Sequence, residues 1–142
     1  MLVVAAPGHR LAGRRVRDRR LLQDERWVGF PPTPGERDSG SVLARQLIHA
    51  GLERADVTLI DSLTAQKRLA QAGFGLALVP ESSVRDELCQ GALVALDIPT
   101  MRTSIPIAAI HRRNGYLSPT AKALLALLTS GKGRGRGVKS TS

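Results

Sequence analysis

Short apolar runs alternate with segments in which apolar residues recur at helical spacing. The run at 74–79 is almost wholly apolar and is bounded by turn signals, which is typical of a parallel strand buried on both faces. We predict strands near residues 1–6, 26–30, 56–60, 74–79, 92–97 and 105–111, and helices near 17–25, 38–51, 62–72, 83–90 and 118–128. Strands that alternate with helices predict an α/β fold with a mostly parallel sheet flanked by helices.

Residues 61–80 form the most informative unit of this pattern. Ser62 is placed to cap a helix by accepting a backbone N–H two or three residues further on. Gly73 supplies the left-handed position that ends the helix, and Pro80 follows the next strand. A unit of this kind brings helix N-termini to one edge of a sheet, where small polar or anionic ligands bind. Ligand binding is therefore the first functional hypothesis.

The formal net charge of +9 suggests a polyanionic partner, but its distribution argues against reading of nucleic acid. Six arginines fall within residues 10–20, and more basic residues lie in a Gly/Ser-rich segment, 131–142, that we predict to be a disordered tail. Aromatic residues make up only 3%, too few for a stacking platform on single strands. No helix-turn-helix, zinc-finger or RNA-binding signature is found. Both a basic binding surface and a simple solvated face remain open for the arginines.

Size and composition fit one domain of about 142 residues with a single core. No apolar run approaches the roughly 20 residues of a membrane-spanning helix. Residues 1–7 lack the basic start and the apolar length of a signal peptide, so we expect a cytoplasmic chain with no membrane partner. The single cysteine, Cys89, excludes an internal disulfide and favours a packing residue or a passive thiol.

Enzyme chemistry is not indicated. His9, His49 and His111 are far apart and show no metal-ligand spacing, so we expect no metal site and no cofactor. Asp61 and Glu81 could suggest paired carboxylates, yet no nucleophile elbow or glycine-rich phosphate loop accompanies them. We therefore expect a binding protein that is not an enzyme.

Five segments in a fixed order give this chain a family resemblance. They are Val4–Ala12, Trp27–Phe30, Asp61–Leu63 with Ala72–Pro80, Gly91–Leu96, and Ile110–Arg113 with Leu117–Pro119. Each segment alone is weakly specific, but together, over about residues 1–129, they resemble the effector-binding domain of LysR-type transcriptional regulators. The resemblance is partial, because the winged helix-turn-helix and most of the first lobe of that family have no counterpart in this sequence.

The resemblance implies a fold like that of periplasmic binding proteins, with two α/β lobes joined by crossing hinge strands. Residues 1–130 would be the partial effector-binding domain, with the second lobe at about 16–104 and the hinge strands at about 1–6 and 105–111. The helix from Ser118 would pack on the first lobe, and the helix at 38–51 resembles the one that family members use to dimerise.

The implied function is ligand sensing in a bacterial transcription regulator, with a small-molecule effector, such as a carboxylate, held in the cleft between lobes. A homo-oligomer is expected, and DNA would be contacted only through a helix-turn-helix absent from this chain. The alternative is a stand-alone solute-binding module with no regulatory role.

Three turns that follow strands are the candidate effector contacts. Each also has a simpler interpretation, as a helix cap at Ser62, a Pro-rich turn after 26–30, or a strand-to-helix turn after 74–79. The candidate residues are Thr33, Gly35, Ser62, Thr64, Pro80 and Ser82.

Overall fold

The computed structural model describes residues 1–32, 41–105, 109–112 and 115–130. The chain consists of two compact units, Met1–Ile105 and Pro106–Ser142. The predicted tail at 131–142 and the candidate residues Thr33 and Gly35 lie outside the described residues.

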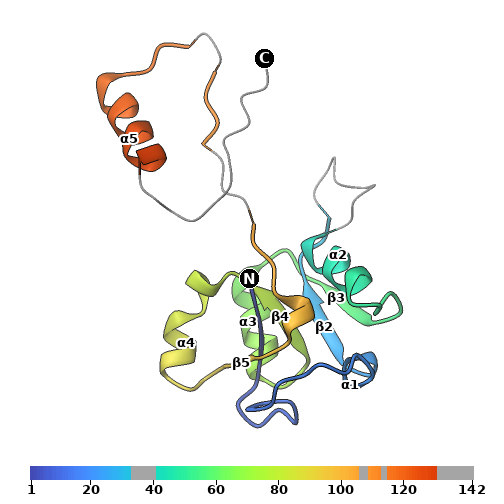
Figure 1. Cartoon of the computed structure of the whole chain (residues 1–142). Coiled ribbons are helices and arrows are strands. Elements are labelled where there is room, and N and C mark those ends of the chain that lie inside the picture. Colours follow the sequence, from blue (N-terminus) through green and yellow to red (C-terminus); the bar gives the residue numbers. More distant parts are fainter. Residues whose placement is uncertain (33–40, 106–108, 113–114, 131–142) are drawn as a thin grey trace. The chain divides into compact units, whose positions relative to one another are not determined.

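The first unit is built on a five-stranded sheet with the order β3-β2-β4-β1-β5 (Figure 1). Its strands are β1 (Leu2–Ala5), β2 (Arg26–Gly29), β3 (Asp56–Leu59), β4 (Leu76–Val79) and β5 (Val94–Leu96). β2 pairs in parallel with both β3 and β4, whereas β1 runs antiparallel to β4 and β5. β4 is central, and all four of its residues are buried, which confirms the prediction for the apolar run. The fold is the expected α/β sheet with helices.

β1 pairs inside the sheet of the first unit. Residues 1–6, which the resemblance assigns to the first crossing strand, contribute β1, with Leu2 opposite Val79 and Ala5 opposite Val94. Its last three residues are buried, so the strand fills the gap between β4 and β5 and completes the core. The second expected hinge strand, 105–111, is not a strand at residues 105 and 109–111, and residues 106–108 lie outside the described part of the chain.

Helices cover both faces of the sheet. On one face, residues of α1 (Arg20–Gln23), α2 (Val42–His49) and the 3₁₀ helix η2 (Pro99–Met101) pack with Leu76 and Leu78 of β4. On the other face, α3 (Leu63–Gln71) and the segment that opens α4 (Arg85–Cys89) pack with Ala77 and Val79. Figure 1 shows α1 and α2 on one flank of this unit and α4 on the opposite flank. The alternation along β4 follows from the two-residue period of a strand.

The local signals at helix ends hold, with two changes of boundary. Gly51 and Gly73 follow α2 and α3 with φ of 70° and 76°, a conformation that glycine adopts without a steric cost. The expected helix at 38–51 begins at Val42, and its residues 38–40 lie outside the described part. The expected helix at 83–90 is divided into the 3₁₀ helix η1 (Glu81–Ser83) and α4, because Val84 leaves the helical region with φ of −125°.

The second unit contains α5 (Pro119–Ser130). It begins as predicted, with Ser118 Oγ accepting the N–H of Ala121 at 3.2 Å and with Pro119 at the first helical position. No residue of α5 is buried, and Leu127 is 70% exposed. Among the described residues, no helix is both long enough and apolar enough to cross a lipid bilayer.

Candidate effector-binding site

The carboxyl ends of three neighbouring strands define one edge of the sheet. β3, β2 and β4 are adjacent and parallel, so the segments that follow them emerge side by side. β3 leads to Ser62 and Thr64, and β4 leads to Pro80 and Ser82. The structure therefore brings four of the six candidate residues to the same edge, where open α/β sheets bind ligands.

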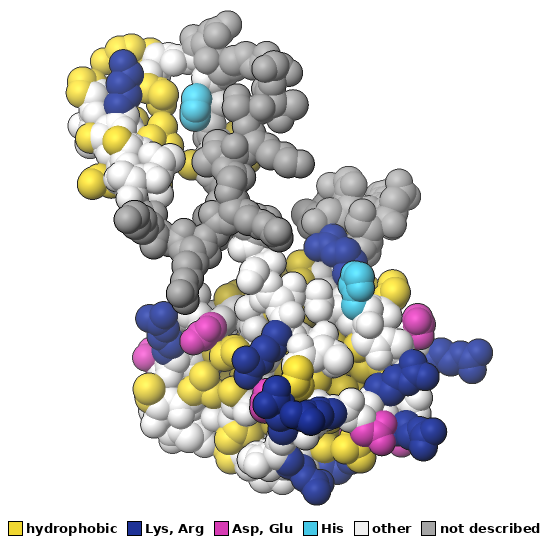
Figure 2. Space-filling view, in the orientation of Figure 1, with side chains coloured by type: hydrophobic (Ala, Val, Ile, Leu, Met, Phe, Trp, Pro, Cys, Tyr) yellow, Lys and Arg dark blue, Asp and Glu magenta, His cyan; other side chains and the backbone are white. Residues whose placement is uncertain are grey.

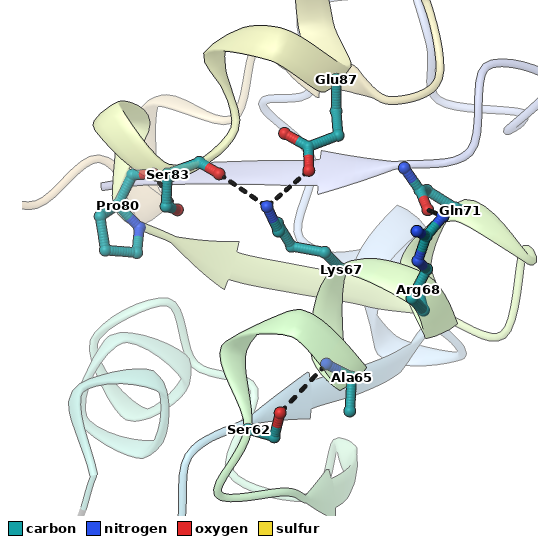
Figure 3. A network of polar contacts seen from close by, with 8 residues as sticks. All are labelled: Ser62, Ala65, Lys67, Arg68, Gln71, Pro80, Ser83 and Glu87. Atoms are coloured by element: carbon teal, nitrogen blue, oxygen red, sulfur yellow. Dashed lines mark hydrogen bonds and ion pairs between the residues drawn. The ribbon is translucent and has the colours of Figure 1, made fainter.

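At the β3 end, Ser62 caps α3. Its Oγ accepts the N–H of Ala65 at 3.3 Å (Figure 3). Its carbonyl accepts the N–H of Gln66 at 3.0 Å. The N–H groups of Leu63 and Thr64 precede the first intrahelical hydrogen bonds of α3. Ser62 and Thr64 are exposed. The hydroxyl of Ser62 is thus engaged in capping, and the groups left for an anion are the backbone amides of the first turn and the hydroxyl of Thr64.

At the β4 end, the turn is closed by its own hydrogen bonds. The Pro80 carbonyl accepts the Ser83 hydroxyl at 2.7 Å and the Ser83 N–H at 3.0 Å. Pro80 is half-buried and Ser82 is exposed. This turn presents Ser82 on a rigid backbone, and both interpretations of the sequence, as a structural turn and as a ligand contact, fit its geometry.

A lysine of α3 connects the segments that follow β3 and β4. Lys67 Nζ donates to the Ser83 carbonyl at 3.0 Å and to Glu87 Oε1 of α4 at 2.5 Å (Figure 3). One ammonium group thereby joins α3, η1 and α4. Lys67, Ser83 and Glu87 are not among the residues predicted from the sequence, because partners 16 and 20 residues apart give no local signal.

The Lys67–Glu87 pair predicts a pH dependence of stability. The Lys67 hydrogen bond, followed by the backbone N–H of Glu87, holds the pKa of this carboxyl below its ordinary value. A lowered pKa in the folded state stabilises the protein above the pKa of the unfolded state, and this stabilisation disappears as the pH falls through the folded value. We expect the wild-type chain to lose more unfolding free energy between about pH 6 and pH 3 than Glu87→Gln, in urea titrations at each pH. Glu53→Gln, a change at an exposed glutamate, is the matched control and should keep the wild-type slope. Equal slopes for all three proteins would contradict the prediction.

Gln66 stabilises the segment that follows β3. Its side chain is fully buried, and Nε2 donates to the Ile60 carbonyl at 2.6 Å, just before the capping turn. Its Oε1 is buried without a hydrogen-bond partner among the described residues. The sequence contained one signal for this placement, because Leu63, Gln66 and Ala70 share the inward face of α3 at spacings of three and four residues.

Two cavities in the described part of the chain are lined by residues other than the candidates. One, of about 250 Å³, lies between the start of β1 and the segment from β5 to η2. The other, of about 370 Å³, lies at the opposite edge of the sheet, where Arg26 and Asp56 begin β2 and β3. Neither of these cavities is lined by Ser62, Thr64, Pro80 or Ser82.

Comparisons with known proteins agree on one family. Residues 1–132 match the model of the LysR substrate binding domain. Uncharacterized HTH-type transcriptional regulators of Mycobacterium bovis and Mycobacterium tuberculosis are 32% identical over 131 residues, which is 91% of this chain and 41% of each relative. The chain therefore spans about two fifths of the length of the curated relatives it matches.

Solved structures show the same fold. The regulatory domain of CcmR from Synechocystis, in complex with 2-PG, has a TM-score of 0.65 and 24% identity, and the match covers 89% of this chain and 60% of that one. The effector binding domain of QuiR, in complex with shikimate, has a TM-score of 0.59 and 20% identity, with coverage of 88% and 57%. The sheet, the capped α3 and the family match over residues 1–132 agree, and the chain belongs to the LysR substrate binding domain family.

Proposed function

We propose that this chain is the ligand-sensing part of a transcription regulator and that it binds a small anionic effector at the carboxyl edge of β2, β3 and β4. The observation that carries the proposal is the convergence at this edge of the capped N-terminus of α3 and the turn after β4. The first-turn amides, which precede the intrahelical hydrogen bonds, and the positive end of the α3 dipole favour a carboxylate. Thr64 and Ser82 would add hydroxyl contacts, and Thr33 and Gly35 would complete the rim.

The relatives support this assignment of class. The curated relatives are HTH-type transcriptional regulators, and the related CcmR and QuiR domains were solved with 2-PG and with shikimate, itself a carboxylate. The regulatory role of these relatives favours a ligand-sensing domain of a regulator over the alternative of a stand-alone solute-binding module. In this role α2, with Ile48 58% exposed, would contact a second copy of the chain.

Paired ligands that differ only in charge test the proposal. We expect benzoate and acetate to raise the melting temperature of the chain more than benzamide and acetamide at equal concentration, because only the carboxylates gain from the helix terminus. Leu63→Pro removes one free first-turn amide at a position where proline fits, since Ser62 is extended, with φ of −121° and ψ of 113°. Each melting shift is measured against the same variant without ligand.

The variants separate amide from hydroxyl contacts. Losing one amide contact of about 0.3–1 kcal/mol should weaken benzoate binding about two- to fivefold in Leu63→Pro. Thr64→Val keeps the amide and removes only the hydroxyl, so it should lose less. Equal shifts from benzoate and benzamide, together with an unchanged affinity in Leu63→Pro, would refute an anion site at this edge.

A further inference from the structure

The arginine-rich connection from β1 to β2, residues 10–20 and called here the arginine segment, lies at the edge of the sheet opposite the proposed effector site. β1 runs antiparallel to β4, so its end at Ala5 and the start of β2 at Arg26 both lie where the parallel strands begin. Figure 2 shows Lys and Arg side chains gathered over the lower part of this unit, where Figure 1 draws this connection.

The backbone of the arginine segment is held in place. Leu11 and Val16 are buried in the core, and the Val16 N–H donates to the Asp97 carbonyl at 2.8 Å. Gly13 makes the turn between them with φ of 69°. Charged side chains on a fixed backbone lose less freedom when they bind a partner than those on a flexible one.

The arginines divide into two groups. Arg10 pairs with Glu25 at 2.7 Å, Arg15 pairs with Asp97 at 3.6 Å, and the guanidinium of Arg19 lies against Gly51 at the end of α2. The side chains of the second group have no carboxylate of the described residues within 4 Å and are exposed. This group consists of Arg14, Arg17 and Arg20.

Charge is segregated along this unit. Residues 10–20 contain six arginines and one aspartate, Asp18, whose carboxylate accepts the backbone N–H of Arg20 at 2.9 Å. The rest of residues 1–105 contains eight Lys and Arg against eleven Asp and Glu. The positive end of the unit is therefore a local feature and does not follow from a generally basic composition.

The chemistry of the arginine segment favours the backbone of a duplex. Leu11 and Val16 of the segment are buried and Leu21 beside it is 37% exposed, which leaves too little apolar surface for the apolar centre of a protein interface. The single tryptophan, Trp27, is also buried, and the segment itself contains no aromatic residue to stack on single-stranded bases. Guanidinium groups match the geometry of phosphate oxygens.

We propose that the arginine segment binds the phosphate backbone of duplex DNA without reading its sequence, through Arg14, Arg17 and Arg20. The family resemblance predicts DNA contact only through a helix-turn-helix, and the contact proposed here would be additional to that one. It would hold the sensing domain against DNA from the edge opposite its effector site.

The test is the salt dependence of DNA binding by the whole chain. We expect fluorescence anisotropy to show binding of a labelled duplex of about 20 base pairs and arbitrary sequence. The plot of log affinity against log salt has a negative slope, and its magnitude should be smaller by about 2–3 in the triple variant R14Q/R17Q/R20Q. Affinity at about 50 mM NaCl should fall at least about tenfold, because three phosphate contacts are lost. An unchanged melting temperature would show that the variant is folded.

The matched control is the triple variant K132Q/R134Q/R136Q, which removes the same charge from the C-terminal segment. Its affinity for the duplex should be higher than that of R14Q/R17Q/R20Q, and its affinity should fall more steeply with salt. Equal losses in both variants would mean attraction by net charge alone and would overturn the proposal. No binding by the wild type, or equally tight binding of poly-glutamate, would overturn it as well.

Discussion

Replacing Gly75 by alanine should lower the free energy of unfolding by about 2 kcal/mol and the melting temperature by about 10 °C. A Cβ at this position would lie 2.4 Å from the carbonyl oxygen of Arg26 and 2.9 Å from its carbonyl carbon. Those atoms belong to the backbone of β2, which is held between β3 and β4 and cannot move aside cheaply. Relief of the clash has to separate β2 from β4 at the start of their pairing.

Urea unfolding of Gly75→Ala beside Gly8→Ala measures this effect. A Cβ on Gly8 meets no atom within 4 Å, so the control should change stability by less than about 0.5 kcal/mol. A Gly75→Ala protein as stable as Gly8→Ala would show that β2 and β4 do not approach each other as described.

Replacing Gln66 by alanine should cost about 2–3 kcal/mol of unfolding free energy, through a cavity and an unpaired Ile60 carbonyl. Gln66→Leu should cost less, because leucine fills the space that alanine leaves empty, whereas both variants lose the hydrogen bond to the Ile60 carbonyl. The comparison separates the volume of the side chain from its hydrogen bond.

Gln71→Ala is the control on the same helix. Gln71 accepts one exposed hydrogen bond from Arg68, and its loss should change stability by less than about 0.5 kcal/mol. Thermal unfolding of the three variants beside the wild type gives the comparison. A Gln66→Leu protein as unstable as Gln66→Ala would contradict the role given to packing here.

Signals that act within a few residues made most of the fold predictable. The apolar run that ends at Val79 forms the central strand, Ser62 and Ser118 cap their helices, and Gly51 and Gly73 end theirs. These features depend on backbone geometry and burial, which local sequence reports directly. The insertion of β1 between β4 and β5 was missed because the choice of a strand's partner depends on contacts across the whole sheet.

The candidate site was also predictable only in part. Its edge was predictable, because parallel strands end together and the residues that follow them are known from the strand positions. The bond from Lys67 to Ser83 and Glu87 was not, because a lysine on a helix gives no indication of which distant acceptors it will meet. Gln66 was not predicted either, since a glutamine within a helix is most often exposed, although its spacing from Leu63 and Ala70 places it on the inward face of α3.

Amide chemical-shift mapping tests the central claim most directly. Titration of the ¹⁵N-labelled chain with benzoate should shift the amides of residues 61–64, 81 and 82 in a saturable way, and benzamide should shift them much less. The amides of the arginine segment should respond weakly and without saturation. Shifts confined to residues 10–20, with Ser62 and Thr64 unmoved, would show charge attraction alone and would contradict an effector site at the carboxyl edge.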